Sequence, residues 1–404
     1  MKCGVWLIFG LLLLTGCRQN SPESVPLPPQ AEPFLQQMQQ ALATQQLTLA
    51  LAMADSVERY APGWPDALFV RGLVYMQQRR YDAAATAFRQ VLERQPHYPG
   101  AWFNLGQNAA LARRYREAIG YYRKELKLAE EVSTSAQTLA AVWTQMGNAY
   151  EQLTRDDSAR AAYEQALRMD STYAEAHAGL SRLLERAGRY EAALRHAEQA
   201  MALAPARLDY RYRVGALLVQ LGRFEEAIPL LQTVAQHWPG HDGAAYNLGR
   251  ALIATGRQEE GQRYLTRADS LQKLTEKLLH ARRRTELQPD DPDAWSTYAR
   301  LLMEAGYLDQ AYTALQTALT LAPGNLALLS NLAALQLAMG DTAGALKGLQ
   351  LLVRADSGFA EGWFNLGVVY AMLGDSEAAR EAWRRTLQLN PEHEAARAYL
   401  SRLQ

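Results

Sequence analysis

The sequence is poor in the residues that most often carry catalysis or hold metals. Only two of its 404 residues are cysteine, Cys3 and Cys17, and its seven histidines are scattered. His237 and His241 are four residues apart, but a Pro–Gly pair between them prevents the shared helical face that a metal site needs. No glycine-rich phosphate loop follows a strand pattern. We therefore expect no metal, no cofactor and no enzymatic activity.

Net charge is absent as well. The chain has 42 basic and 42 acidic residues, so it has no net field that would hold nucleic acid. The densest basic run, residues 282–284, is expected to solvate a helix rather than to bind phosphate. The acidic run at 290–293 resembles the start of a calcium loop but lacks its glycine and distal glutamate, so we expect it to end and cap helices.

Repetition is what the sequence does have. A motif recurs every 34 residues, and its clearest copy consists of Trp363, Leu366, Gly367, Tyr370, Ala379, Trp383 and Pro391. Ten copies begin at residues 31, 65, 99, 140, 174, 208, 242, 292, 326 and 360, with insertions at 133–139 and 276–291. The copies account for nearly everything after residue 30, so we expect no second domain.

The pattern within each copy predicts two helices. Apolar residues fall at positions 4, 7, 8 and 11 and again at 20, 24 and 27, which is the spacing of two successive helical stripes. Position 20 is alanine in nine copies and Gly261 in the seventh, and position 8 is small except for Met38 in the first. Small side chains let two helices cross closely, so each copy should be a helical hairpin. One hairpin cannot bury its own apolar face, so neighbouring copies must stack.

This length and pattern resemble the tetratricopeptide repeat. The resemblance implies an all-α fold, a solenoid formed as a right-handed superhelix of about ten helical hairpins. The polar-faced tail from residue 392 would then be a C-terminal capping helix.

Proline predicts where the second helices end. It stands at position 32 in six copies, while Glu130 and Lys273 replace it in the two copies that are followed by insertions. No glycine or proline follows Lys273 before residue 288, so we predict one helix from about 258 to 287. After Glu130 we expect a turn, where Thr134 and Gln137 have capping-box spacing for a new helix.

The first seventeen residues look like a bacterial lipoprotein signal. The apolar stretch from Val5 to Leu14 is too short to span a bilayer, and the sequence Leu14–Cys17 resembles a lipobox. The resemblance implies that Cys17 is diacylated, with palmitate expected, and becomes the first residue of the mature chain. Arg18 then favours the outer membrane, facing the periplasm, with the inner membrane and the cell surface as alternatives. An ordinary secretory signal with a chance cysteine is the other interpretation.

These patterns divide the chain into four parts. Residues 1–16 form the signal peptide, and 17–30 form a lipidated proline-rich tether rather than a proline ligand. Repeats 1–7 occupy 31–291, and repeats 8–10 with the capping helix occupy 292–404. Removal of the signal would leave Cys17 as the one remaining cysteine, which excludes an intramolecular disulfide.

The first helix of each copy carries the candidate binding residues. In related arrays these helices line a concave groove and expose positions 5, 6 and 9 among others. Position 6 is an amide in six copies, and these amides resemble the asparagine ladder of the O-linked N-acetylglucosamine transferase. The resemblance implies that they hydrogen-bond a peptide backbone. Position 5 is aromatic in five copies. The amides and aromatics that we select are Asn104, Asn247, Asn331, Asn365, Phe103, Tyr246 and Phe364.

Arginines extend this groove. We expect Arg182, Arg213 and Arg300 to be neutralised on their own helices by Glu185, Asp209 and Glu304 respectively, whereas Arg250 has no such neighbour. No copy carries the position-5 lysine typical of carboxylate-clamp co-chaperones. The plainer alternative is that the amides are soluble filler and that the aromatics pack between repeats.

The sequence therefore predicts a membrane-anchored scaffold or adaptor for an envelope assembly process. Its partners would be proteins or extended peptide segments bound in the groove, and the lipid on Cys17 would attach it to the membrane. No nucleic acid or small-molecule substrate is expected. Two alternatives remain open: a structural or self-associating array, and an accessory subunit of a peptide-modifying glycosyltransferase.

Overall fold

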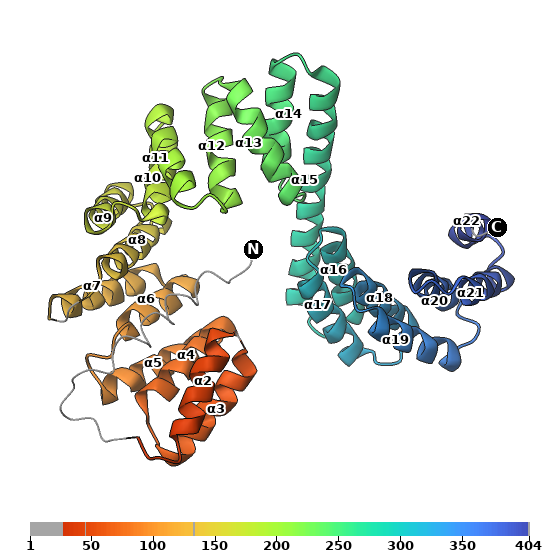
Figure 1. The fold of residues 1–404 in the computed structure, drawn as a ribbon, viewed down its shortest axis with the longest axis horizontal. Helices are drawn as coiled ribbons and strands as arrows, with labels where there is room; N and C mark the ends of the chain where they lie inside the picture. The colour runs from red at the N-terminus through yellow and green to blue at the C-terminus, as the bar shows by residue number, and fades with distance from the viewer. Residues whose placement is uncertain (1–26, 45, 132–133, 403–404) are drawn as a thin grey trace. The chain divides into compact units, whose positions relative to one another are not determined.

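The computed structural model describes residues 27–402 except 45 and 132–133, and every regular element in that part is a helix (Figure 1). Twenty helices form ten consecutive hairpins, and one more follows them, as the sequence predicts. The hairpins are α2 (Glu32–Ala43) with α3 (Leu47–Tyr60), α4 (Pro65–Gln77) with α5 (Tyr81–Arg94), α6 (Ala101–Leu111) with α7 (Tyr115–Glu131), α8 (Ala136–Gln152) with α9 (Asp156–Met169), α10 (Ala174–Arg186) with α11 (Tyr190–Leu203), α12 (Leu208–Gln220) with α13 (Phe224–His237), α14 (Asp242–Ala254) with α15 (Gln258–Leu287), α16 (Pro292–Glu304) with α17 (Leu308–Leu321), α18 (Leu326–Ala338) with α19 (Thr342–Ala355), and α20 (Ala360–Met372) with α21 (Ser376–Leu389). The last helix is α22 (Glu394–Arg402).

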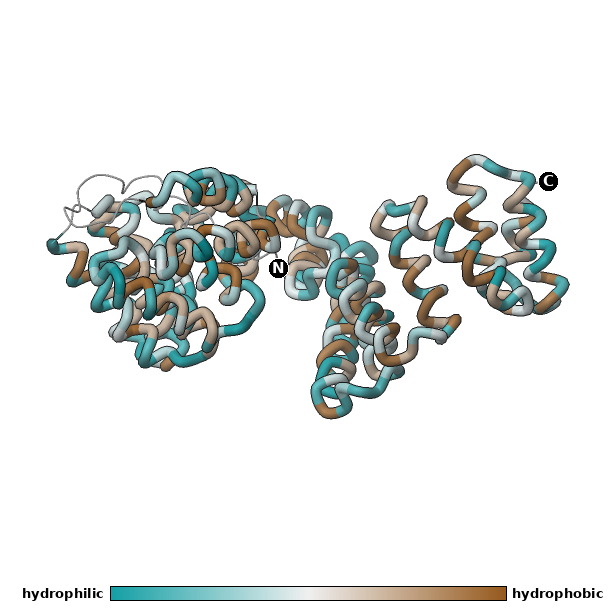
Figure 2. Tube along the Cα trace, turned by 90° about the horizontal axis from the view of Figure 1, so that it is seen from below, coloured by the Kyte–Doolittle hydropathy of each residue, from teal (hydrophilic) through white to brown (hydrophobic). Residues whose placement is uncertain are grey.

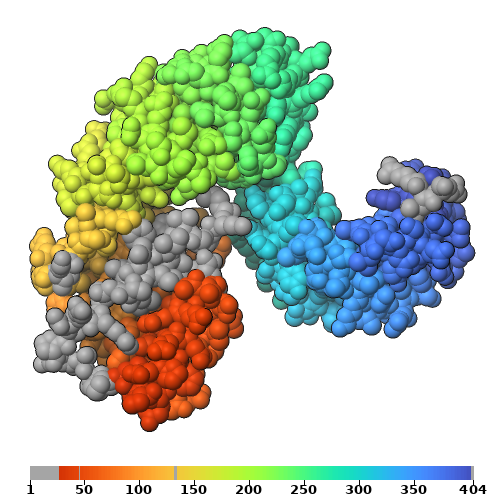
Figure 3. Space-filling model, in the orientation of Figure 1, coloured from red at the N-terminus to blue at the C-terminus, as the bar shows by residue number. Residues whose placement is uncertain are grey.

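The chain divides into two compact units, Met1–Leu230 and Leu231–Gln404. The division that the sequence suggests between residues 291 and 292 stays a prediction. Hydrophobic and hydrophilic residues alternate along the helices of both units (Figure 2), and side chains fill the space between paired helices (Figure 3). Within the described residues, no helix combines the length and apolar character that crossing a bilayer requires.

A small residue at position 8 lets the two helices of a hairpin approach each other. A Cβ atom added to Gly72 would lie 2.6 Å from the ring of Phe88, and one added to Gly147 would lie 2.6 Å from the ring of Tyr163. The large side chain is at position 24 in both copies. The first copy reverses the arrangement, since Met38 and Ala54 are fully buried in one cluster. Bulk at one of the two positions thus excludes bulk at the other.

Position 20 completes this packing. Its alanine is fully buried in all nine copies that have one. In the seventh copy the helices are closer still, because a Cβ on Gly261 would lie 2.7 Å from the carbonyl oxygen of Gly249. The requirement for small residues at helix crossings, predicted from the sequence, is confirmed.

The helix ends follow the prolines closely. In all six copies with proline at position 32, the second helix ends two residues before it. The long helix predicted after Lys273 is confirmed as α15, whose Leu265 lies beside Gly249 and whose Leu278 packs against the cluster of α16 and α17. Asp291 caps α16 by accepting a hydrogen bond from the backbone N–H of Asp293.

The starts of two helices differ from the prediction. The cap of α8 is Ser135, whose Oγ accepts a hydrogen bond from the backbone N–H of Thr138, so the predicted cap at Thr134 is wrong by one residue. The capping helix starts at Glu394 and places Tyr399 against the last repeat, with its ring 5.1 Å from that of Trp383.

Two glycines of the third repeat provide a test of this packing. Gly106→Ala should lower the free energy of unfolding by ~1–3 kcal/mol, because the new methyl group would overlap the buried ring of Tyr122. Gly120→Ala is the matched control: nothing lies within 4 Å of its added Cβ. That control should stabilise the helix by ~0.5–1 kcal/mol through helix propensity. Urea unfolding of both variants would measure the two changes, and equal effects would contradict the packing.

Candidate functional site

The amides predicted at position 6 do not form a uniform ladder. Asn104 is only 3% exposed, and its Nδ2 donates a hydrogen bond of 2.8 Å to the carbonyl of Gly100. Asn247 is 9% exposed and donates in the same way to Gly243, at 2.9 Å. The expectation that these two amides are open to a partner is wrong, because each is buried and hydrogen-bonded to its own helix.

The other two amides differ from this pair. Asn331 is exposed on α18. Asn365 is half-buried on α20, and its Nδ2 donates to the Oγ of Ser330 at 2.9 Å, which joins the last two repeats. Asn331 is therefore the predicted amide that is most accessible to a partner.

The aromatic residues at position 5 also differ in their exposure. Phe103 is 5% exposed and packs against Tyr122, so the expectation that it is accessible is wrong. Phe364 lies against His393 at a ring distance of 4.6 Å and also touches Tyr399 of the capping helix. Both serve packing. Tyr246 on α14 is 50% exposed and remains open to a partner.

The inner arginines of unit 1 form ion pairs between repeats. Arg213 pairs with Glu185 of the preceding repeat at 2.6 Å, so its predicted pairing with Asp209 is wrong. Asp209 instead pairs with Arg207 at 2.8 Å. Arg182 likewise binds Glu151 of the preceding repeat rather than the predicted Glu185. These pairs connect residues 28 and 31 positions apart on different helices, so the spacing within one helix does not reveal them.

Glu151 is the centre of the strongest of these networks. Its carboxylate accepts hydrogen bonds from Arg182 at 3.0 Å, from Arg186 at 2.7 Å and from the Tyr163 hydroxyl at 2.8 Å. Burial alone would raise the pKa of Glu151, but the two guanidinium groups lower it to about 2. The carboxylate therefore stays ionised, and the network joins repeats 4 and 5 instead of offering free charge to a ligand.

Unit 2 keeps free polar groups on its first helices. Among the described residues, Arg250 forms no ion pair, and its guanidinium lies 5.7 Å from the ring centre of Tyr246 one turn earlier. Arg300 on α16 is 65% exposed in its side chain and is 3.9 Å from Glu304, its predicted neighbour. An exposed pair at this distance leaves the guanidinium largely available.

Glu125 on α7 is a buried carboxyl group that the sequence analysis missed. It stands at position 27, where other copies have mainly apolar residues, and that contrast was the available signal. It is 8% exposed, and its two oxygens accept hydrogen bonds from the backbone N–H groups of Gly100 and Phe103 at 3.2 and 3.1 Å. Burial raises the pKa of Glu125 to about 7, although the two hydrogen bonds oppose that shift.

Two further predictions concern lipid and metal. Cys17 lies outside the described residues, so its lipidation stays a prediction. In the part of the chain that the structure describes, no group of three or more His, Cys, Asp or Glu side chains is placed to hold a metal ion. His241 instead caps α14, accepting a hydrogen bond from the backbone N–H of Ala244.

Family models identify the repeats. Models of the tetratricopeptide repeat match residues 35–99, 69–132 and 144–207, then 185–234, 218–275 and 302–366, and finally 360–393. These matches cover most of the chain, so the chain belongs to the tetratricopeptide repeat family. The repeats define it as a scaffold for protein–protein interaction.

Several solved structures are similar to the chain or to part of it. YrrB, described as a TPR protein with an unusual peptide-binding site, is 23% identical over 47% of this chain and 94% of its own, with a TM-score of 0.39. MamA of Desulfovibrio magneticus RS-1 is 20% identical over 45% of this chain and 99% of its own, also with a TM-score of 0.39. The APC/C hetero-tetramer Cut9–Hcn1 is 13% identical over 98% of both chains, with a TM-score of 0.32. No curated protein matches the chain.

Glu125 makes the stability of the third repeat depend on pH. Its pKa in the folded state, about 7, lies above the ordinary value of 4.5, so the folded chain holds this proton more tightly than the unfolded chain does. The resulting stability is present below pH 4.5 and should be lost as the pH rises through 7, by at most ~3 kcal/mol. Glu125→Gln should remove this decrease, whereas the exposed Glu93→Gln should keep it. Chemical unfolding between pH 5 and 8 would measure it, and a decrease that persists in Glu125→Gln would assign it to another group.

Proposed function

We propose that the chain is a membrane-anchored scaffold that holds partner segments on the first helices of unit 2. The observation that carries this proposal is the pair formed by Tyr246 and Arg250 on α14. A half-exposed tyrosine offers a rigid apolar surface, and a guanidinium over its ring offers a charge-assisted hydrogen bond. Neither side chain is needed for the hairpin packing described above.

The geometry favours a peptide segment that carries a carboxylate. Arg250 has no acidic partner among the described residues, so it gains an ion pair when a carboxylate binds. The exposed amide of Asn331 and the exposed Arg300 lie on α18 and α16, two first helices that contact each other. Asn331 offers an amide and Arg300 offers a cation, so the first helices of these repeats also carry groups that can bind a peptide.

The anchor belongs to the same proposal. The Leu14–Cys17 sequence supports diacylation of Cys17, and the proline-rich residues that follow provide a spacer between lipid and repeats. A scaffold tethered in this way would gather its partners at the periplasmic side of the outer membrane. The envelope process served is expected to be an assembly process.

Replacing the central pair tests the binding surface. Tyr246→Ala together with Arg250→Ala should weaken binding of a partner captured by crosslinking about tenfold or more, as loss of an aromatic and an arginine anchor does at other interfaces. The control is Tyr307→Ala, which removes a tyrosine of similar exposure from the N-terminus of a second helix. High salt should reproduce the Arg250 effect only. A titration in which the double variant binds as tightly as the parent would place the surface elsewhere.

Replacing the lipidated residue tests the anchor. Cys17→Ser should move the protein from the detergent-extracted membrane fraction to the aqueous fraction, because acyl chains supply the membrane affinity. Mass spectrometry of the parent should find acyl groups on Cys17. Equal membrane recovery of both proteins, with no acyl mass on the parent, would reject the lipoprotein assignment.

A further inference from the structure

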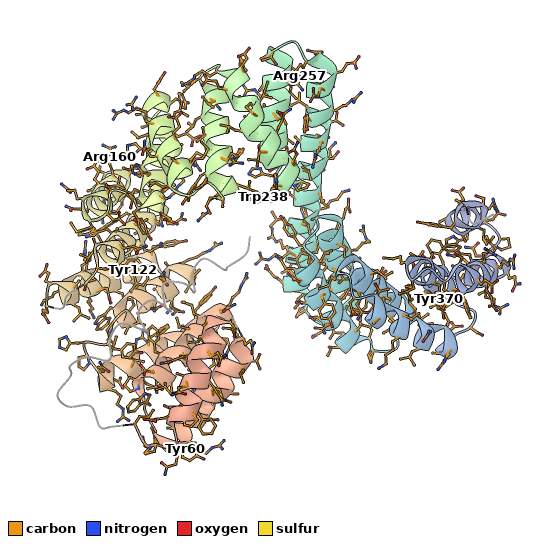
Figure 4. All side chains as sticks on the ribbon, in the orientation of Figure 1. Tyr60, Tyr122, Arg160, Trp238, Arg257 and Tyr370 are labelled. Carbon is orange, nitrogen blue, oxygen red and sulfur yellow. The ribbon has the colours of Figure 1, made fainter. Side chains whose placement is uncertain are left out.

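A groove lies between two second helices of unit 1, α9 and α11. Side chains of α9 and α11 form its walls and those of α10 its floor, and its volume is about 450 Å³. Leu180 and Leu183 lie on the floor and are only 5% and 4% exposed. Arg160, labelled in Figure 4, projects from α9. The groove thus has a recessed apolar floor between polar walls.

The walls are strongly basic. Four arginines and one glutamate line them: Arg160, Arg168, Arg189, Arg195 and Glu164. Three of these arginines form no ion pair with any residue that the structure describes, and Arg160 reaches only the almost fully exposed Asp157 at 3.7 Å. Some other surface arginines of unit 1 have a close acidic partner, as Arg114 has in Asp82 at 2.8 Å. In the groove Glu164 is the one acidic side chain among the lining residues, so the walls keep an excess of positive charge.

The environment of the histidine on the wall favours its neutral form. The Nδ1 of His196 lies 3.0 Å from the Nδ1 of His177, which holds the ring against α10. Burial, together with His177 and Arg195, lowers the pKa of His196. The four arginines and Glu164 therefore determine the charge of the groove, which is positive.

One of the four arginines stands where most repeats have an apolar residue, and the tenth copy, with Arg380, also has an arginine there. Arg160 stands at position 21, which is apolar in seven of the ten copies. The equivalent residues in the two preceding copies are Ala85 and Ile119. A cation at this position does not follow from the hairpin packing, so its presence is not explained by the fold.

We propose that this groove binds an acidic segment of a protein partner, with one bulky apolar side chain of that segment inserted between the arginines onto the leucine floor. Carboxylates on both sides of the apolar residue would meet the unpaired arginines of the two walls. This surface is separate from the Tyr246–Arg250 pair, so one chain has two binding surfaces of different character.

The shape of the groove favours a peptide over a membrane or a nucleic acid. A flat bilayer surface would reach the arginine heads, but the floor leucines are recessed and a side chain must project to touch them. Nucleic acid binding uses aromatic stacking or grooves that follow a phosphate backbone, and no aromatic ring of Phe, Tyr or Trp lines these walls. A projecting apolar side chain between acidic neighbours matches both features.

The test uses the full chain and a fluorescein-labelled synthetic peptide in which one phenylalanine is flanked by glutamates. Arg168→Gln with Arg195→Gln should weaken binding about tenfold, measured by fluorescence anisotropy, because one unpaired charge is removed from each wall. Both side chains are exposed and unpaired, so thermal unfolding should be unchanged. Arg116→Gln is the control, since it removes an exposed arginine of the same unit outside the groove.

Two further probes separate the floor from the walls. A peptide with alanine in place of phenylalanine should bind several-fold more weakly to the parent chain. If the groove arginines serve a peptide and not a membrane, the double variant and the parent should bind phosphatidylglycerol vesicles to the same extent. The proposal is overturned if the peptide does not bind the parent, if Arg116→Gln weakens binding as much as the double variant does, or if the alanine peptide binds unchanged. It is also overturned if the double variant loses vesicle binding but keeps peptide binding.

Discussion

The close crossing of two helices is the constraint on which the rest of this structure depends. Each hairpin has little room at position 8 when position 24 is large, as Gly147 and Tyr163 show, and position 20 must always be small. Because the hairpins are this tight, their apolar stripes face the next repeat, and neighbouring copies must stack to bury them. The side chains outside these positions are then free to vary from copy to copy.

The side chains at these variable positions have different roles in different repeats. In repeats 5 and 6 the inner arginines bind glutamates of the preceding repeat, and the Glu151 network is sufficiently buried and hydrogen-bonded to act as a structural connection. In repeat 7 the corresponding surface keeps Tyr246 and Arg250 without such partners. In repeat 3, Glu125 fills a core position with a carboxyl group that ordinarily would be ionised. One fold therefore supports a rigid joint, an open surface and a buried titratable group.

The sequence predicts the fold far better than the surface, and the reason is physical. Helix bounds follow from proline, small residues and apolar spacing, which act within one hairpin; α15 matches its predicted bounds for this reason. The exposure of Asn104 depends on packing around the helix start, and its amide folds back onto Gly100. The partner of Arg213 lies one repeat away, so only the stacking geometry identifies Glu185. The sequence shows that Glu125 is a carboxyl group at a position where other copies are mainly apolar. It does not show that its oxygens accept hydrogen bonds from the backbone N–H groups of Gly100 and Phe103.

A site-specific photocrosslinker gives the most direct test of the claim that the first helices of unit 2 carry the binding surface. It would replace Tyr246 on α14 in one protein and Leu351 on α19 in another, since both side chains are at least half exposed. After illumination in intact cells, the account predicts discrete crosslinked products from position 246 and few from position 351. Products from position 351 with none from position 246 would contradict it and would assign binding to the second helices.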